Sequence, residues 1–476
     1  MSDLATKTKK GLQWSAVERI LTQGIQLVLT LLLARLLGPV AFGLVGMLAV
    51  FIAIANVFVD SGFTSALIRK TDRTDSDLVT AFYYNIIISG FCYLILYFVA
   101  PYTVGFYHQS ELQGLLRTLG LTVLINAFTL IPRMQLTVAM DFKVQAKISV
   151  ISVLVSGCAA IVLALHDYGV WALVIQTLLN AVFNLILFNL YSPWLPRGRA
   201  TRESFNYLFG FGSKLLLSGL LDVIYNNIYQ IIIGKKFTSA VVGHFTQANQ
   251  LASVPAMTLT SIIQRVTFPL FSQLQDHTDN MESVYRVTLK MSAVIIFPLI
   301  IGLGLIAQPL LTSLLGEQWQ DAASLLSVLC MGYMLYPVHA INLNLLQVMG
   351  RSDIFLKLEV IKKTIGIVIL LVSIPYGVLG MCIGFSLTSY FSLLFNTYYT
   401  AKIIRISQWQ QFKDLAPIWL AVIISAVVAY IVGQHWKVQP WLQIIINLSV
   451  AVLIYLLYLV LAQKALLLQV RNALRR

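Results

Sequence analysis

Two apolar runs follow one another near the start of the chain. Residues 11–34 are GLQWSAVERILTQGIQLVLTLLLA and residues 41–61 are AFGLVGMLAVFIAIANVFVDS, with RLLGPV between them. An α-helix needs about 20 apolar residues to cross the hydrocarbon core of a bilayer, and each run has that length. The sequence therefore predicts two membrane-spanning helices that are joined by a short turn.

The whole chain has the composition of these two runs. Of its 476 residues, 58% are hydrophobic and 11% are charged, and the mean hydropathy is +0.81. An average soluble domain has roughly 25% charged residues, so a soluble fold is excluded. About fourteen helices of spanning length leave only short loops, and a large domain outside the membrane is excluded as well.

Cutting the apolar runs at glycine, proline and charged residues predicts an all-α polytopic membrane protein with about fourteen transmembrane helices. The expected helices are residues 11–34, 41–61, 79–103, 113–132, 146–165, 169–190, 207–233, 241–264, 284–308, 322–347, 355–374, 378–399, 415–434 and 441–462. The polar N-terminus is followed by no small-residue cleavage site, so the first helix is expected to be retained. A short segment, residues 63–69, follows the second helix.

The basic residues predict the orientation of these helices. The chain has 33 Lys and Arg against 19 Asp and Glu, a formal net charge of +14. With the N-terminus inside, 26 of the 33 fall in the cytoplasmic tails and loops and the adjoining helix ends, and 5 fall on the other side. The positive-inside rule describes this distribution. Both termini are therefore expected in the cytoplasm, and the charge requires no nucleic-acid partner.

A pattern repeats at an offset of about 200 residues. The matching positions are Ala34-Arg35 with Gly234-Lys235, Gly43 with Gly243, and Tyr168-Gly169-Val170 with Tyr376-Gly377-Val378. The repeat predicts a six-helix half over residues 1–204, a second over 205–400, and two appended helices with a basic tail over 401–476. Transporters with parallel repeats bind cargo in a cleft between the halves. Chance similarity of short loops is the alternative.

Polar residues within the first predicted helix share one face. Arg19, Gln23, Gln26 and Thr30 have helical spacing, and Arg19 lies roughly 12 Å from the cytoplasmic end of the helix. Intramembrane charges are costly and mark functional sites by default. Water or a polar ligand is therefore expected beside this face. Glu18 is a further charge there, for which pairing with Arg19 or a place near the membrane surface is the alternative.

The seventh helix, which the repeat matches to the first, also has a polar face. Its members are Lys214, Ser218, Asp222, Tyr225, Asn226 and Tyr229. The two faces are expected to line one central cleft. Asp222 falls near mid-membrane, where a cavity or a buried hydrogen-bonded pair is expected. Lys214 has the alternative of extending its amine to the cytoplasmic surface.

Several other polar residues favour structural roles. Asp60 is expected to cap or form the turn before residues 63–69 rather than to contact cargo. His339 favours a polar packing contact over a proton relay. Pro255, Pro298 and Pro337 interrupt predicted helices, as hinges or as static kinks. The cysteines are expected to be small core residues. They are Cys92, Cys158, Cys330 and Cys382.

The loops carry a family resemblance. The stretches are Ala34-Arg35-Leu36-Leu37-Gly38-Pro39 with Phe42-Gly43, Tyr168-Gly169-Val170-Trp171-Ala172-Leu173-Val174, Val266-Thr267-Phe268-Pro269-Leu270-Phe271-Ser272, and Gly350-Arg351-Ser352-Asp353 before Glu359 and Lys362-Lys363. In this order and spacing the chain resembles the Wzx-type polysaccharide and O-antigen flippases. Within the multidrug/oligosaccharidyl-lipid/polysaccharide exporter superfamily it most resembles the colanic acid exporter branch.

The resemblance implies an activity, a cargo and a location. The implied activity is export of an undecaprenyl-diphosphate-linked oligosaccharide across the bacterial inner membrane, by alternating access, for lipopolysaccharide or exopolysaccharide biosynthesis. Membrane lipids and the polysaccharide polymerase and chain-length machinery are the implied partners, and no cofactor or metal is implied. The diphosphate would need cationic donors, for which Arg19, Lys214 and Arg265 are the candidates. Gln23, Gln26, Tyr225, Asn226 and Tyr229 are the candidates for binding sugars.

Two other classes of function remain alternatives. A multidrug cation antiporter of the same superfamily would share the fold, but it needs a more apolar cleft and usually lacks the last two helices. A membrane polymerase or ligase would need a sizeable outer loop with catalytic groups, whereas the longest candidate, residues 316–321, has only Glu317 and Asp321. A transporter rather than an enzyme is therefore predicted. Coupling to protons or sodium ions would need an acidic site, for which Glu18 and Asp222 are the candidates.

Overall fold

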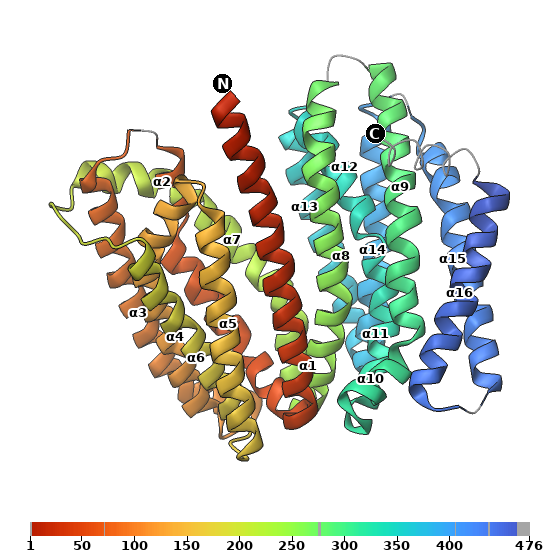
Figure 1. The fold of residues 1–476 in the computed structure, drawn as a ribbon, viewed down its shortest axis with the longest axis horizontal. Helices are drawn as coiled ribbons and strands as arrows, with labels where there is room; N and C mark the ends of the chain where they lie inside the picture. Colours follow the sequence, from red (N-terminus) through yellow and green to blue (C-terminus); the bar gives the residue numbers. More distant parts are fainter. Residues whose placement is uncertain (1, 71, 275–277, 405, 437, 464–476) are drawn as a thin grey trace. The chain divides into compact units, whose positions relative to one another are not determined.

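A computed structural model describes residues 2–70, 72–274, 278–404, 406–436 and 438–463, with side chains from Leu21 onward except 278–279. All its regular elements in these ranges are helices (Figure 1). The chain divides into two compact units, unit 1 (Met1–Gly243) and unit 2 (His244–Arg476). The half boundary at residues 204 and 205 rests on the sequence repeat and stays a prediction.

Unit 1 is a helical bundle. Its elements are α1 (Ser2–Asp60), α2 (Phe63–Arg69), α3 (Asp75–Tyr107), α4 (Leu112–Val138), α5 (Phe142–Leu165), α6 (Trp171–Tyr191), α7 (Arg202–Lys236) and the first residues of α8 (Ser239–Gln273). Helix α4 packs against α3 and α6, and α5 packs against α1 and α6, as Figure 1 shows. Helix α7 packs against α1, α2 and α3, so it belongs to this bundle.

Helix α1 contains both of the apolar runs that open the sequence. It breaks at Gly38, whose φ of 74° and ψ of 177° are not helical, and Pro39 begins the second arm. Glycine adopts positive φ without a steric penalty, and proline suits the first position of a helix because its missing N–H needs no partner there. The two predicted helices and their turn are confirmed as two arms of one kinked element.

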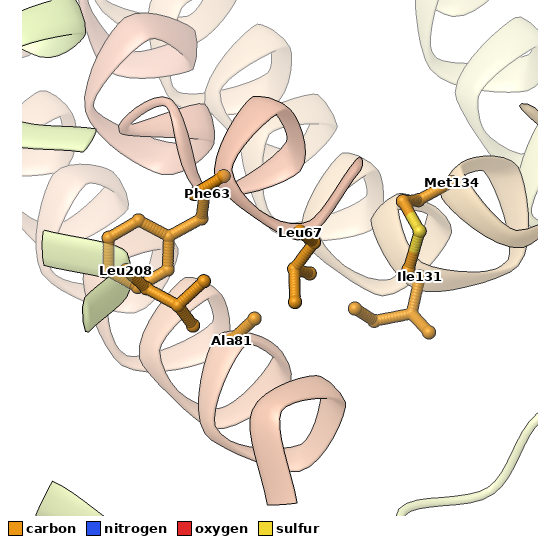
Figure 2. Packing of buried hydrophobic residues seen from close by; sticks show 7 residues of the cluster. Phe63, Leu67, Ala81, Ile131, Met134 and Leu208 are labelled. Atoms are coloured by element: carbon orange, nitrogen blue, oxygen red, sulfur yellow. The ribbon is translucent and has the colours of Figure 1, made fainter. Parts of the chain in front are cut away.

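Helix α2 has the bounds that the sequence predicted, and apolar contacts hold it. Figure 2 shows Phe63 and Leu67 of α2 in a buried cluster with residues of three neighbouring helices, namely Ala81, Ile131, Met134 and Leu208. The Thr64 hydroxyl donates to the Asp60 carboxylate over 2.7 Å, so the predicted turn role of Asp60 is confirmed. The N-cap position itself is occupied by Gly62, at a φ of 69°.

Unit 2 contains most of α8 and all later helices. They are α9 (Thr278–Leu305), α10 (Ala307–Leu315), α11 (Gln320–Tyr333), α12 (Tyr336–Val348), α13 (Ser352–Ser373), α14 (Gly377–Ala401), α15 (Gln408–His435) and α16 (Pro440–Ala462), with short 3-10 turns Glu317–Trp319 and Ile374–Tyr376. Two polar side chains of α8 form hydrogen bonds with later helices. The Tyr333 hydroxyl donates to Asn249 over 2.8 Å, and the Gln264 amide donates to Asn344 over 3.2 Å.

Ion pairs connect the appended helix α15 to α9. Asp414 of α15 is buried and accepts from Arg286 over 2.7 and 3.0 Å. Lys290, one turn further along α9, reaches the same carboxylate at 2.9 Å. One buried anion thus holds two partly exposed cations of the neighbouring helix.

Eleven helical stretches within the described ranges are long and apolar enough to cross a membrane. Two of them, Leu21–Arg69 and Ser352–Ala401, contain the break at Gly38 or the 3-10 turn before Gly377. Helix α8 has sufficient length but is not among the eleven, because it is too polar. The polytopic all-helical prediction is confirmed, whereas the count of about fourteen stays a prediction.

One of the smaller expectations needs correction. Pro337 interrupts the expected helix over 322–347, as predicted, because this stretch is divided into α11 and α12 and Pro337 lies in the first turn of α12. Pro255 and Pro298 do lie inside α8 and α9. Three cysteines are buried, but Cys158 is exposed, since its position in α5 faces away from the bundle. The packing role of His339 is confirmed by contacts to Ser389 at 3.0 Å and Asn396 at 3.1 Å.

Candidate functional site

A polar cavity of about 650 Å³ lies within unit 1. Helices α1, α2, α4, α5 and α6 form its walls. The polar lining residues are Thr22, Asn56, Asp60, Thr64, Ser65, Asn126, Thr129, Arg133, Thr137, Ser149, Asn180 and Asn184. The volume falls within the range of about 300–1,000 Å³ that is usual for small-molecule sites. A cavity with so many amides and hydroxyls inside helices of spanning length is a candidate site for a polar ligand.

Helix α4 supplies one polar wall of the cavity. Asn126, Thr129, Arg133 and Thr137 recur at intervals of three and four residues, and this spacing places them on one face of the helix. At a rise of 1.5 Å per residue, Asn126 and Arg133 are separated by about 10 Å along the helix axis. The wall therefore extends over most of the length of a disaccharide-sized ligand.

Helix α6 supplies a second wall through two half-buried asparagines one turn apart. The Asn184 amide nitrogen donates to the Asn180 side-chain oxygen over 2.7 Å and to the Asn180 carbonyl over 2.9 Å. These bonds fix both side chains. The nitrogen of Asn180 and the oxygen of Asn184 remain for a ligand, and together they present one donor and one acceptor.

Arg133 is the cation of the cavity. It lies five residues before the end of α4, is exposed, and has no hydrogen bond or ion pair to its guanidinium within the part of the chain whose side chains are described. Asp60, the cavity's acidic residue, bonds to Thr64 instead. A cation within a membrane span is costly unless water or an anion accompanies it, so Arg133 gives the cavity an affinity for anions.

Helix α2 forms one wall of the cavity, and an ion pair connects its C-terminal end to α3. Lys70 donates to the buried Asp77 carboxylate over 2.8 Å. The same carboxylate accepts from the backbone and side chain of Thr74. The hydrogen bond to Asp77 raises the pKa of Lys70. Lys70 therefore keeps its charge in this contact at physiological pH.

Most of the residues that the sequence predicted as a site lie in unit 1, outside the lining of this cavity. On α7, Lys214, Asp222 and Asn226 are exposed, while Tyr225 and Tyr229 are half-buried. Gln23 and Gln26 of α1 are half-buried and follow Thr22, which lines the cavity. Asp222 is therefore exposed and does not line the cavity of unit 1.

The remaining predicted residues are Arg265, Glu18 and Arg19. Arg265 is exposed on α8 in unit 2. Glu18 and Arg19 lie on α1, but their side chains are outside the described residues. The binding and coupling roles predicted for these residues remain predictions.

Arg133 is not among the residues that the sequence singles out, because the expected fourth helix ends at Pro132 and Arg133 then falls in the following cytoplasmic loop. The structure corrects this, because α4 contains Pro132 and continues to Val138. Proline costs one backbone bond and is tolerated in transmembrane helices where neighbouring groups satisfy the freed carbonyl. The signal available in the sequence was the helical spacing of four polar residues on one face, namely Asn126, Thr129, Arg133 and Thr137.

With the helices and cavity established, the fold is similar to that of two solved transporters. The lipid II flippase MurJ in an inward closed conformation superposes with a TM-score of 0.73 at 14% identity, covering 94% of this chain and 100% of MurJ. An inward-facing multidrug resistance MATE family transporter has a TM-score of 0.62 at 17% identity, covering 80% of this chain and 95% of the other. The fold is thus that of the multidrug/oligosaccharidyl-lipid/polysaccharide exporter superfamily.

Relatives identified by sequence show to which family within this superfamily the chain belongs. The teichuronic acid biosynthesis protein TuaB of Bacillus subtilis is 26% identical over 466 residues, which cover 97% of this chain and 96% of TuaB. The lipopolysaccharide biosynthesis protein WzxC of Escherichia coli is 26% identical over 447 residues, covering 92% and 89%. The family model "Polysaccharide biosynthesis protein" matches residues 32–324. The chain belongs to this family, and the predictions of a Wzx-type flippase family and of a transporter rather than an enzyme are confirmed.

Proposed function

We propose that the protein moves a lipid-linked oligosaccharide from the cytoplasmic to the periplasmic leaflet of a bacterial inner membrane, for surface polysaccharide biosynthesis. The observation that carries the proposal is a polar cavity inside the helical bundle of a polysaccharide biosynthesis protein, with an arginine that has no ion-pair partner among the described side chains. A transporter of lipids alone has no need for a dozen polar groups at this depth. A sugar head group would satisfy them.

The cargo that fits this role is an undecaprenyl-diphosphate-linked repeat unit. In this proposal Arg19, Lys214 and Arg265 hold the diphosphate, and the predicted polar faces of α1 and α7 contact sugars. The contacting residues are Gln23, Gln26, Tyr225, Asn226 and Tyr229. Outward movement of two negative charges across an inside-negative membrane releases roughly 4.6 kcal/mol per 100 mV, which favours export.

The mechanism we propose is alternating access of two six-helix halves, within about fourteen transmembrane helices and with both termini cytoplasmic. The repeat supports it. Gly169 and Gly377 occupy matching positions before α6 and α14, and both have positive φ, 52° and 75°. Glu18 and Asp222 are the proposed residues for any proton or sodium coupling. Partners would be the polymerase and chain-length machinery of the same pathway.

The charge of the cavity argues against the multidrug antiporter alternative. Organic cations would meet the guanidinium of Arg133 and would be repelled by it. An anionic or neutral polyhydroxylated cargo has no such penalty.

Deletion of the protein in its native host tests the proposal. Lipid-linked oligosaccharides of complete repeat-unit size should accumulate on the inner leaflet, detected by their resistance to a membrane-impermeant glycan-modifying reagent applied from outside. Surface polysaccharide should fall in parallel. Unaltered lipid intermediates together with unaltered surface glycan would overturn the flippase proposal. Accumulation of monomeric repeat units on the outer leaflet would instead support the polymerase alternative.

A further inference from the structure

We infer that the cavity of unit 1 binds the anionic sugar portion of the cargo, with Arg133 as the anchor for its negative charge and Asn126, Asn180 and Asn184 as the binding groups for its hydroxyls. The inference rests on the proposed function and adds the chemistry of the head group. It also assigns a site that differs from the predicted faces of α1 and α7.

The charged residues that line the cavity indicate which class of ligand it binds. Its lining has one cation, Arg133, and one carboxylate, Asp60, among the described residues. A ligand with a single anionic group beside Arg133 and neutral hydroxyls elsewhere would match this lining. A polyanion would place additional charge near Asp60, and like charges in a membrane span repel strongly. The site therefore fits a pyranose ring that has one carboxylate or one phosphate.

The geometry of the donors supports recognition of hydroxyls. Asn180 and Asn184 are held by their mutual bond, so their free groups are oriented before the ligand arrives. Asn126 is exposed on the α4 wall, about 10 Å along the helix axis from Arg133. The buried hydroxyl of Thr22 also lacks a hydrogen-bond partner among the described residues. Pairing with a sugar would satisfy groups that are otherwise left without partners.

The anion has two conceivable sources, an acidic sugar of the repeat unit or the phosphate of the lipid carrier. Both present two oxygens to a planar guanidinium. Binding to the purified full-length protein in lipid nanodiscs, measured by isothermal titration, separates them. The probes are glucuronic acid for the acidic sugar, undecaprenyl phosphate for the carrier, glucose 1-phosphate for a phosphate on a sugar, and glucose as the neutral reference.

Arg133→Gln is the test variant for the anchor. We expect it to weaken binding of the anionic probes by about tenfold or more and to leave glucose binding unchanged. Arg117→Gln is the matched control, because Arg117 is on the same helix, stacks on Tyr97 at 4.0 Å and does not line the cavity. Arg133→Lys keeps the charge and should retain part of the affinity, which separates a binding role from a folding role.

Asn184→Ala tests the wall that binds hydroxyls. It should weaken binding of all three sugar probes and leave undecaprenyl phosphate unaffected. The control is Asn189→Ala, since Asn189 is on the same helix and donates to its own backbone at Leu185 over 2.9 Å, outside the cavity.

The outcomes are distinguishable from those of the flippase test. An Arg133-dependent loss confined to glucuronic acid identifies an acidic sugar, and one confined to the phosphates identifies the carrier. Equal affinity of wild-type protein and a monodisperse Arg133→Gln variant for every anionic probe overturns the inference, even if deletion of the protein blocks export. Arg133-dependent binding with unaltered export would overturn the proposed function alone.

Discussion

A Cβ atom on Gly43 would lie 3.1 Å from the backbone nitrogen of Gly243 and would overlap the carbonyl oxygen of Ser239. The contact is reciprocal, because a Cβ on Gly243 would overlap the carbonyl oxygen of Pro39. All four residues belong to unit 1, and positions 39 and 43 are offset by 200 from positions 239 and 243. The second arm of α1 and the start of α8 thus cross backbone to backbone at equivalent positions of the repeat.

Substitution of either glycine by alanine should destabilise this crossing. The added methyl group meets backbone atoms that no side-chain movement relieves, so we expect a loss of about 1–3 kcal/mol or more in unfolding free energy. Thermal unfolding of the detergent-purified variants, followed by size-exclusion chromatography, measures it. Gly105→Ala is the control, since a Cβ there meets nothing within 4 Å. If Gly43→Ala and Gly105→Ala unfold at the same temperature, the close crossing is wrong.

Asp414→Ala should loosen α15 from α9. It removes the buried carboxylate and leaves Arg286 and Lys290 without their shared partner. Because both cations are partly exposed, we expect a loss of roughly 2 kcal/mol, which is below the range for fully buried pairs. Faster limited proteolysis between α14 and α15 would report it. Asp353→Ala breaks an exposed pair with Arg351 and should leave stability unchanged, because solvent screens this pair.

Lys70→Met should destabilise α2. The buried Asp77 carboxylate would lose its cationic partner, at an expected cost of about 1–3 kcal/mol. The pKa of Lys70 is raised by Asp77. A raised pKa means that the contribution is fully present below the pKa of the unfolded state, about 10.4, and is lost as the pH rises through the folded-state value. The melting temperatures of the wild type and the variant should therefore differ equally at pH 7 and pH 9. Lys147→Met, at an exposed position of α5, should show no difference from the wild type.

Arg19→Ala and Asp222→Ala should block export while leaving membrane insertion intact. Asp222 is exposed on α7, so its removal creates no cavity in the core. We expect a reduction in surface polysaccharide of about tenfold or more if each contacts the charged cargo or a coupling ion. Complementation of a deletion strain measures export, and immunoblotting of membranes measures insertion. Lys236→Ala, in the last turn of the same helix, is the control. Full export by both variants would remove these residues from the site.

Apolar runs were sufficient to predict where most helices lie. The expected helix over 441–462 corresponds to Pro440–Ala462, and that over 378–399 corresponds to Gly377–Ala401. Helix ends were less predictable. The seventh helix was expected from residue 207, but α7 begins at Arg202 after a cap in which the Thr201 side chain accepts from the Ser204 backbone. Charged residues end the part of a helix that suits hydrocarbon, but they do not end the helix.

The candidate site was less predictable than the fold. Charges deep within apolar runs indicated α1 and α7, whereas the polar lining of the cavity consists mostly of uncharged asparagines, threonines and serines on five helices. Which of these side chains converge depends on helix rotation, and this is set by packing contacts between segments far apart in the chain. Arg133 was accessible to sequence reasoning only if the helix was allowed to continue through Pro132.

The polar composition of α8 has a consequence for the synthesis of the protein. A segment that is not apolar enough gains too little from lipid to leave the translocon alone. The partners of its Asn249 and Gln264, which are Tyr333 and Asn344, follow 84 and 80 residues later. At a translation rate of about 5–20 residues per second, the segment waits roughly 4–17 s for them. During this interval Asn249 and Gln264 lack the partners that later helices give them in the finished protein.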